Sequence, residues 1–107
     1  MHLDSIGDVI GVRDVEVVSA EGHAGKVSVI IGAPRPFEDA TGYYCPFQIV
    51  GLASADVKYA AGIDAIQALQ LVMPMIGATL QFLIQNSDSR LRWDGGKEGD
   101  FGFPSNM

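Results

Sequence analysis

The sequence predicts a two-layer α+β fold, in which an antiparallel sheet of four or five strands packs on one long, kinked helix. The first half of the chain carries short runs of β-branched and aromatic residues, separated by turns that contain Gly or Pro. The second half carries one uncharged stretch, residues 65–84, in which apolar residues recur at helical spacing. The 107 residues, of which 48% are hydrophobic, predict a single domain that spans residues 1–107.

Two strands joined by a hairpin loop are expected first. Residues 9–18 are rich in valine, and Gly11 within them predicts a bulge or a bend. Residues 19–25 contain two glycines and predict the loop. Residues 26–31 alternate between two faces, one of them apolar, which indicates a half-buried strand.

A third and a fourth strand follow a loop at residues 32–42, which contains two prolines. Residues 43–50 alternate between two faces and predict the third strand. Pro46 has no N–H to donate, so this strand is expected to lie at a sheet edge there or to be bulged. Residues 57–59 predict a short fourth strand, and the hairpin connections imply antiparallel pairing.

The long helix is expected to begin at Asp64, whose carboxylate can accept hydrogen bonds from the first-turn amides. Gln67 stands three residues further on and completes a pattern that resembles a capping box. Pro74 removes one backbone hydrogen bond and predicts a kink. The apolar stripe expected to face the sheet consists of Ile66, Leu69, Met73, Ile76, Leu80 and Leu83. Additional apolar residues widen the stripe beyond what one sheet face covers.

Residues 65–84 are also about long enough to cross a bilayer. Gln67, Gln70 and Gln81 are costly in lipid, and Pro74 lies in the middle of the stretch. No cluster of Lys or Arg flanks either end. We therefore expect the buried helix of a soluble protein and no association with a membrane.

The chain after the helix predicts one more strand and a tail. Residues 90–93 form the expected strand, with Leu91 and Trp93 turned inward. The tail that follows is rich in glycine, and Phe101 and Phe103 are expected to anchor it to the core.

Several segments between residues 43 and 104 resemble a family of small bacterial proteins of unknown function. They include the strand Tyr44-Cys45-Pro46-Phe47, the helix start Gly62-Ile63-Asp64-Ala65-Ile66-Gln67-Ala68-Leu69-Gln70, and the segments Met75-Ile76-Gly77-Ala78, Arg90-Leu91-Arg92-Trp93 and Gly102-Phe103-Pro104. The likeness covers residues 43–104 and departs from the family pattern at Pro74. It implies one bacterial domain and no assigned activity, and the compactness and acidity of some members imply an accessory or toxin-neutralising role.

Composition excludes several functional classes. Thirteen acidic and seven basic residues give a net charge of −6, which disfavours binding to nucleic acid. One cysteine excludes an intramolecular disulfide framework, and with two histidines it leaves little for a structural zinc site. No secretory signal is visible, so a cytoplasmic location is expected. No cofactor is expected.

No residue is predicted to be catalytic, because each candidate has a simpler structural explanation. Cys45 lies on the apolar face of its strand, which indicates a buried hydrophobic residue rather than a nucleophile. Asp64 is explained by helix capping. Residues 94–105 resemble a calcium loop only in part, since its third and twelfth positions are Gly96 and Ser105, so no metal site is expected.

Basic residues on the expected strands indicate a ligand site. The sheet face that points away from the helix is expected to carry four of the seven basic residues, namely Lys26, Lys58, Arg90 and Arg92. Arginine there would bind a carboxylate or a phosphate through paired N–H donors. The candidate ligand-binding residues on this face and its border are Tyr44, Gln48, Lys58, Arg90, Arg92 and Trp93. The alternative is ordinary cross-strand pairing with Asp14 and Glu16.

Two functional hypotheses follow. The first is a non-enzymatic protein-interaction module, whose apolar helix is covered by a second copy in a homodimer and whose acidic surface binds a partner protein, as an immunity protein does. The second is a protein that binds a small anionic ligand, or a minor enzyme, with its site on the open sheet face. A concave pocket with convergent polar groups would favour the second hypothesis.

Overall fold

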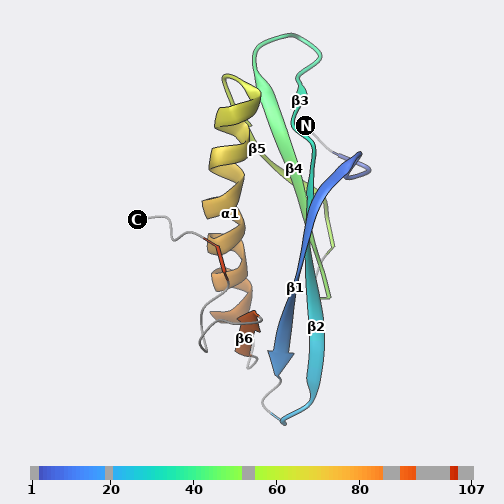
Figure 1. The fold of residues 1–107 in the computed structure, drawn as a ribbon, viewed down its shortest axis with the longest axis vertical. Coiled ribbons are helices and arrows are strands. Elements are labelled where there is room, and N and C mark those ends of the chain that lie inside the picture. The colour runs from blue at the N-terminus through green and yellow to red at the C-terminus, as the bar shows by residue number, and fades with distance from the viewer. Residues whose placement is uncertain (1–2, 19–20, 52–54, 86–89, 94–101, 104–107) are drawn as a thin grey trace.

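The computed structural model describes residues 3–18, 21–51, 55–85, 90–93 and 102–103. Its elements are β1 (Val9–Val18), β2 (Ala24–Gly32), β3 (Arg35–Pro36), β4 (Tyr43–Val50), β5 (Lys58–Gly62), α1 (Ala65–Gln85) and β6 (Arg90–Trp93). The strands form one six-stranded antiparallel sheet, and α1 lies along one face of it (Figure 1). This confirms the predicted two-layer α+β fold. The short strand β3 lies in the segment that was expected to be a loop.

The order of the strands follows from their register. Tyr44 pairs with both Arg35 and Ala61, so β3 and β5 lie on opposite edges of β4. β2 pairs with β4 on the same side as β3. β1 then pairs with β2, and β6 pairs with β1. The sheet therefore runs from β5 through β4, β2 and β1 to β6. Since α1 joins β5 to β6, it connects the two opposite edges of the sheet.

Two irregularities that the sequence predicts are present in the sheet. The register of β1 with β2 shifts between Val9 and Gly11, which confirms the bulge expected at Gly11. β4 has neighbouring strands on both sides over most of its length, but its pairing on the β2 side is interrupted between Tyr44 and Phe47. At Pro46 the strand is therefore a local edge on that side, as expected. Pro46 lies within this interruption, where a missing N–H breaks no ladder bond on that side.

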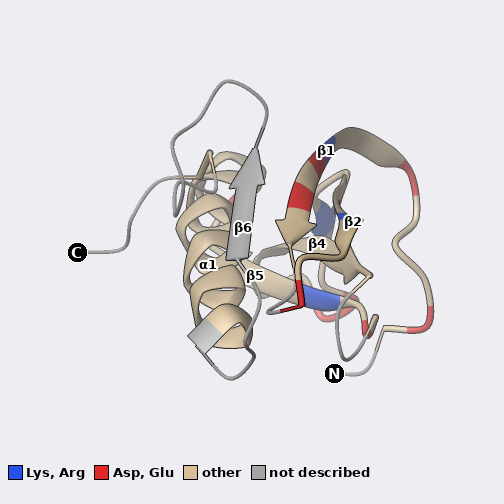
Figure 2. Cartoon of the chain, turned by 90° about the horizontal axis from the view of Figure 1, so that it is seen from below, with Lys and Arg blue, Asp and Glu red and all other residues tan. Residues whose placement is uncertain are grey.

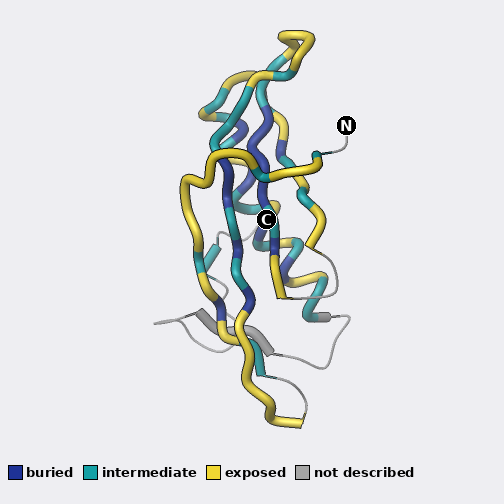
Figure 3. Tube along the Cα trace, turned by 90° about the vertical axis from the view of Figure 1, so that its right-hand side faces the viewer, coloured by how far each residue is buried: buried dark blue, intermediate teal, exposed yellow. Residues whose placement is uncertain are grey.

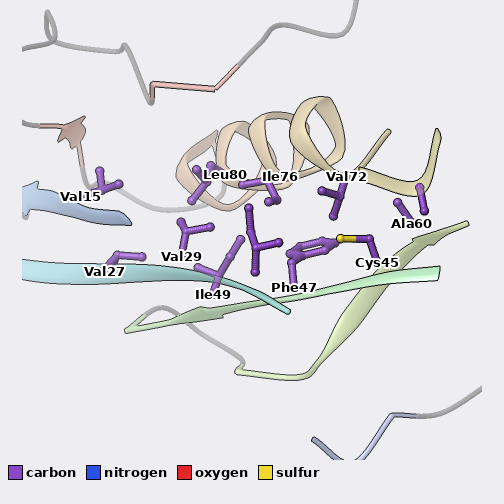
Figure 4. Packing of buried hydrophobic residues seen from close by; sticks show 12 residues of the cluster. Val15, Val27, Val29, Cys45, Phe47, Ile49, Ala60, Val72, Ile76 and Leu80 are labelled. Carbon is purple, nitrogen blue, oxygen red and sulfur yellow. The ribbon is translucent and has the colours of Figure 1, made fainter. Parts of the chain in front are cut away.

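The core lies between α1 and the helix-facing side of the sheet (Figure 4). Phe47 on β4 is its largest fully buried side chain. The other buried members are Val15, Val27, Val29, Ile31, Cys45, Ile49, Ala60, Ala68, Val72, Ile76 and Leu80. Phe103 of the tail packs against this cluster, as expected of an anchor. Phe101 lies outside the described residues.

The helix contacts the sheet through most of the predicted stripe, since Leu69, Met73 and Leu83 also pack against the core. Ile76 and Leu80 are fully buried as expected, but Ile66 is 70% exposed. The other fully buried helix residues are Ala68 and Val72. The reason is close approach, because a Cβ at Gly62 would lie 2.5 Å from the backbone nitrogen of Ala68. A small residue is needed at this contact, and apolar periodicity alone does not show that.

The N-terminal cap of α1 forms as predicted. The backbone N–H of Gln67 donates to the Asp64 carboxylate at 2.8 Å, and the backbone N–H of Ile63 donates to the Gln67 side chain at 2.7 Å. The two side chains thus satisfy amides that have no partner within the helix. From this cap α1 runs through Pro74 to Gln85 without a break.

The segment before β1 crosses the sheet face that points away from α1 (Figure 3). Leu3 forms a bridge with Val57, and the backbone N–H of Ala33 donates to the carbonyl oxygen of Asp8 at 2.7 Å. The segment touches the strands closely, since a Cβ at Gly32 would lie 2.3 Å from the carbonyl oxygen of Ile6. This end of the face, which was expected to be open, is therefore covered.

Candidate functional site

The outer face of α1 is an apolar surface that the sheet does not cover. Leu71, Met75 and Phe82 are 44%, 39% and 63% exposed and lie on one side of α1, whereas Ile66, which is 70% exposed, lies on a different side of the helix. The helix contains no Asp, Glu, Lys or Arg, and Figure 2 shows no charged residue along its described length. Among the described residues, no second layer packs over Leu71 and Met75, because the sheet can bury only one side of the helix. Exposed apolar side chains gathered along one side of a helix are typical of interaction sites.

Four exposed residues of this face follow a regular spacing. Leu71, Met75, Ala78 and Phe82 are separated by steps of four, three and four residues. This is the spacing of the seam along which two helices pack in a coiled coil. We call these four residues the α1 stripe. The exposed small residue Ala78 near its middle allows a facing helix to approach closely.

The helix is also long and apolar enough over Ala65–Ile84 to cross a membrane, and 28% of this segment is buried within the protein. Helices in the cores of soluble proteins meet the same criteria. Here Ala68, Val72, Ile76 and Leu80 pack on the sheet, so α1 is the core helix of this fold.

Tyr44, one of the residues of the predicted sheet-face site, is buried in an aromatic cluster. Its ring lies 5.1 Å from that of Phe37 and 5.9 Å from that of Tyr59, measured between centroids. The Arg35 guanidinium lies over the same ring at 5.4 Å, and a Cβ at Gly7 would lie 2.9 Å from one of its nitrogens. Arg35 therefore packs between Tyr44 and the N-terminal segment. Its Nε is buried and has no hydrogen-bond partner.

Lys58 is not on the sheet face where it was expected. It pairs with Phe47, which faces α1, and it lines a small hollow with Asp56, Thr79 and Leu83. The expectation was wrong because the register of β5 places Tyr59, and not Lys58, beside Pro46 on the outer face. Gln48 is half-buried, and its side-chain amide donates to the carbonyl oxygen of Ala55 at 2.7 Å. Lys58 thus does not join Tyr44 in one site.

The described part of the outer sheet face carries charges of both signs. Lys26 forms an ion pair with Asp14 at 3.8 Å, and the Ser28 hydroxyl donates to the same carboxylate at 2.7 Å. This is the cross-strand pairing that was the alternative to a ligand site. In the register of β6, Arg92 stands opposite Glu16 and Arg90 opposite Val18, whereas Trp93 stands opposite Val15. The side chains of β6 lie outside the described residues.

A basic residue outside the predicted set, Arg13, lines a cavity of about 320 Å³ on the helix-facing side of the sheet. Arg13 pairs with Val29 and therefore shares its face of the sheet. The alternation of β1 contained this signal, since Arg13 is in phase with the buried Val15. A charged residue at an inward position is a stronger pointer to a site than one at an outward position, because burying a charge is costly.

Cys45 behaves as the buried hydrophobic residue that was predicted. Its side chain is fully buried, and burial raises the pKa of the thiol from the ordinary value of 9.0 to about 11. Its Sγ lies 3.5 Å from the carbonyl oxygen of Gly32, to which the thiol donates. At neutral pH the thiolate is therefore scarce, which disfavours nucleophilic chemistry. Within the described ranges, no three His, Cys, Asp or Glu side chains gather in a way that could hold a metal ion.

Comparison with known families decides what the chain is related to. A family model described as a domain of unknown function, DUF6968, matches residues 12–105. The chain belongs to DUF6968. No curated protein and no solved structure matches it.

The DUF6968 match shows which parts of the described surfaces belong to the family domain. It includes the whole of α1 and every strand from Val12 onward, and therefore the α1 stripe and Arg13. The segment before β1 that covers the outer sheet face precedes the match. The predicted resemblance to a family of unknown function is thus confirmed, over a longer part of the chain than the expected residues 43–104.

Proposed function

We propose that this DUF6968 protein is a protein-interaction module that acts by contact and not by catalysis, and that its α1 stripe pairs with the same stripe of a second copy. The observation that carries the proposal is the exposure of Leu71 and Met75 on a helix without any charged residue. An exposed apolar seam of heptad spacing gains free energy when a second helix covers it.

Charge supports a second copy as the occupant. The protein carries a net charge of −6, so two copies repel each other when acidic surfaces meet. The outer face of α1 carries no charge, so two copies can meet there without desolvating an ionised group. A two-fold axis across the helix would make the stripe self-complementary, which is the commonest form of homodimer.

The homodimer would then present the acidic surfaces outward. A net charge of −6 per chain favours a basic partner protein through complementary charge, as in an accessory or immunity-like role. This role needs no membrane and no nucleic acid, and it is compatible with the expected cytoplasmic location.

The mass of the protein in solution tests the proposal. In sedimentation equilibrium at micromolar concentration, the wild-type protein is expected at twice the 11.4 kDa mass of the chain. The double variant Leu71→Glu/Met75→Glu places two carboxylates in the seam and is expected to weaken the dimer by about tenfold or more. Circular dichroism checks that the variant folds, and Leu71→Gln is the milder substitution if it does not.

Ala61→Glu is the matched control, because it adds a carboxylate at an exposed position of β5, outside α1. It is expected to leave the dimer intact. A wild-type monomer at micromolar concentration would overturn the proposal. So would co-sedimentation of wild-type protein, but not of the double variant, with vesicles of three parts phosphatidylcholine to one part phosphatidylglycerol, since the stripe would then face a membrane.

A further inference from the structure

The cavity beside Arg13 has the size and lining of a small-molecule site. It measures about 320 Å³ and lies between β1, β2, α1 and the tail. Val29 and Ile31 contribute from β2, Met73 from α1 and Phe103 from the tail. Volumes from about 300 Å³ upward with a mainly apolar lining and a few polar groups are typical of ligand pockets. The cavity is separate from the α1 stripe, since Met73 is not one of its members.

Arg13 places a fixed positive charge in this apolar wall. Its guanidinium lies 5.0 Å from the centre of the Phe103 ring, and its Nη1 donates to the carbonyl oxygen of Gly102. These contacts hold the side chain in place between β1 and the tail. A guanidinium carries five N–H donors and stays protonated in proteins. Two of these donors can bind a carboxylate while the others keep their contacts with the protein.

Gly11 keeps part of the cavity open. It lines the cavity, and it pairs with Ile31 two positions before Arg13 on the same strand. A Cβ at Gly11 would meet no atom within 4 Å. A larger side chain at this position would therefore enter space that is empty and would not collide with the backbone. This makes the volume of the cavity adjustable by one substitution.

We propose that this cavity binds a small amphipathic carboxylate, with its apolar body against Val29, Ile31 and Met73 and its carboxylate at the Arg13 guanidinium. The apolar lining selects a hydrocarbon or aromatic body, and the guanidinium selects an anionic end over a neutral or cationic one. This activity goes beyond pairing of the α1 stripe and does not depend on it.

Filling the cavity tests the proposal, with hexanoate at millimolar concentration as the probe. Hexanoate is expected to raise the melting temperature of the wild-type protein and to shift amide resonances of β1 and β2. Gly11→Leu is expected to abolish both effects, because the leucine side chain occupies the cavity. Gly25→Leu is the matched control, since Gly25 is also a strand glycine at which a Cβ would meet no atom within 4 Å, and it does not line the cavity.

A second arm tests the charge. Arg13→Gln is expected to weaken hexanoate binding by about 10-fold or more, as loss of a charge-assisted hydrogen bond does, and Arg13→Lys is expected to restore part of it. Hexanol, which has the same body without the carboxylate, is expected to bind the wild-type protein as weakly as hexanoate binds Arg13→Gln. Equal responses of wild-type protein and Gly11→Leu to hexanoate, or equal binding of hexanol and hexanoate, would overturn the proposal. The mass of Gly11→Leu in solution is measured as well. If this variant is still a dimer, its loss of hexanoate binding does not come from a failure of the α1 stripe to pair.

Discussion

At the scale of single residues, small side chains set the distance between the two layers. Gly62 and Ala68 meet where β5 turns into α1, and a Cβ at Gly62 would lie 2.5 Å from the helix backbone. Ala60 on the same strand is also buried. The helix therefore turns Ala68 and Val72 to the sheet, and Ile66 is left outside. One close contact thus determines which larger side chains are exposed at the start of the helix.

The thiol of Cys45 gives a prediction at the same scale. A pKa raised from 9.0 to about 11 lowers the thiolate fraction at pH 8 by about 100-fold. We expect a disulfide reagent such as dithionitrobenzoate to react with the folded protein at least 100-fold more slowly than with the protein in guanidinium chloride. Equal rates in the two conditions would show that Cys45 is accessible in the folded state.

The same pKa shift has a consequence for stability. The folded state holds the Cys45 proton more tightly than the unfolded state, so the contribution of Cys45 to stability is complete below about pH 9. Between pH 9 and pH 11 the unfolded state loses this proton first. The contribution therefore falls as the pH rises through this range.

At the scale of elements, local patterns predict the secondary structure well. The predicted bounds of β1, β4 and β6 agree with the structure, because strand alternation and turn residues act over a few neighbouring positions. β3 lies in the segment expected to be a loop, because a strand of two residues, one of them Pro36, is too short to show an alternation. β5 extends beyond residue 59 to Gly62, since its pairing with β4 and not its own composition holds it in place.

The cap of α1 gives the prediction at this scale. Asp64→Ala removes the acceptor of the Gln67 amide and is expected to lower the free energy of unfolding by about 1 kcal/mol. Asp64→Asn is expected to cost much less, because asparagine caps helices about as well as aspartate. Urea unfolding at a fixed protein concentration measures both changes. Equal losses for the two variants would indicate that the charge of Asp64, and not its cap, stabilises the helix.

At the scale of the whole molecule, the arrangement of layers decides which surfaces are available. The protein extends 48 Å along its longest axis, and one helix is the only layer described on one side of the sheet. The α1 stripe is exposed for that reason. On the other side, the segment before β1 covers the end of the sheet at Pro46 and Tyr44, where an open ligand-binding face was expected.

The contact of this segment with the sheet can be tested at Gly32. A Cβ there would lie 2.3 Å from the Ile6 carbonyl oxygen and 2.8 Å from Pro46 Cγ. Gly32→Ala is expected to lower the free energy of unfolding by about 1–3 kcal/mol, as overpacking does. Gly25→Ala, where a Cβ meets nothing within 4 Å, is expected to leave it nearly unchanged. Thermal or urea unfolding of the two variants measures the difference, and similar stabilities would show that the segment is not held against Gly32.

The sequence by itself determined the α+β class, most strand bounds, the capped and uncharged helix, the burial of Cys45 and the membership of a family without known function. These follow from patterns between residues that are close in the chain. The tertiary structure decided which face of each strand meets the helix, and so moved Lys58 away from Tyr44 and brought Arg13 to a cavity. It also decided that the N-terminal segment covers one surface while the α1 stripe stays exposed, because coverage depends on packing between residues far apart in the chain.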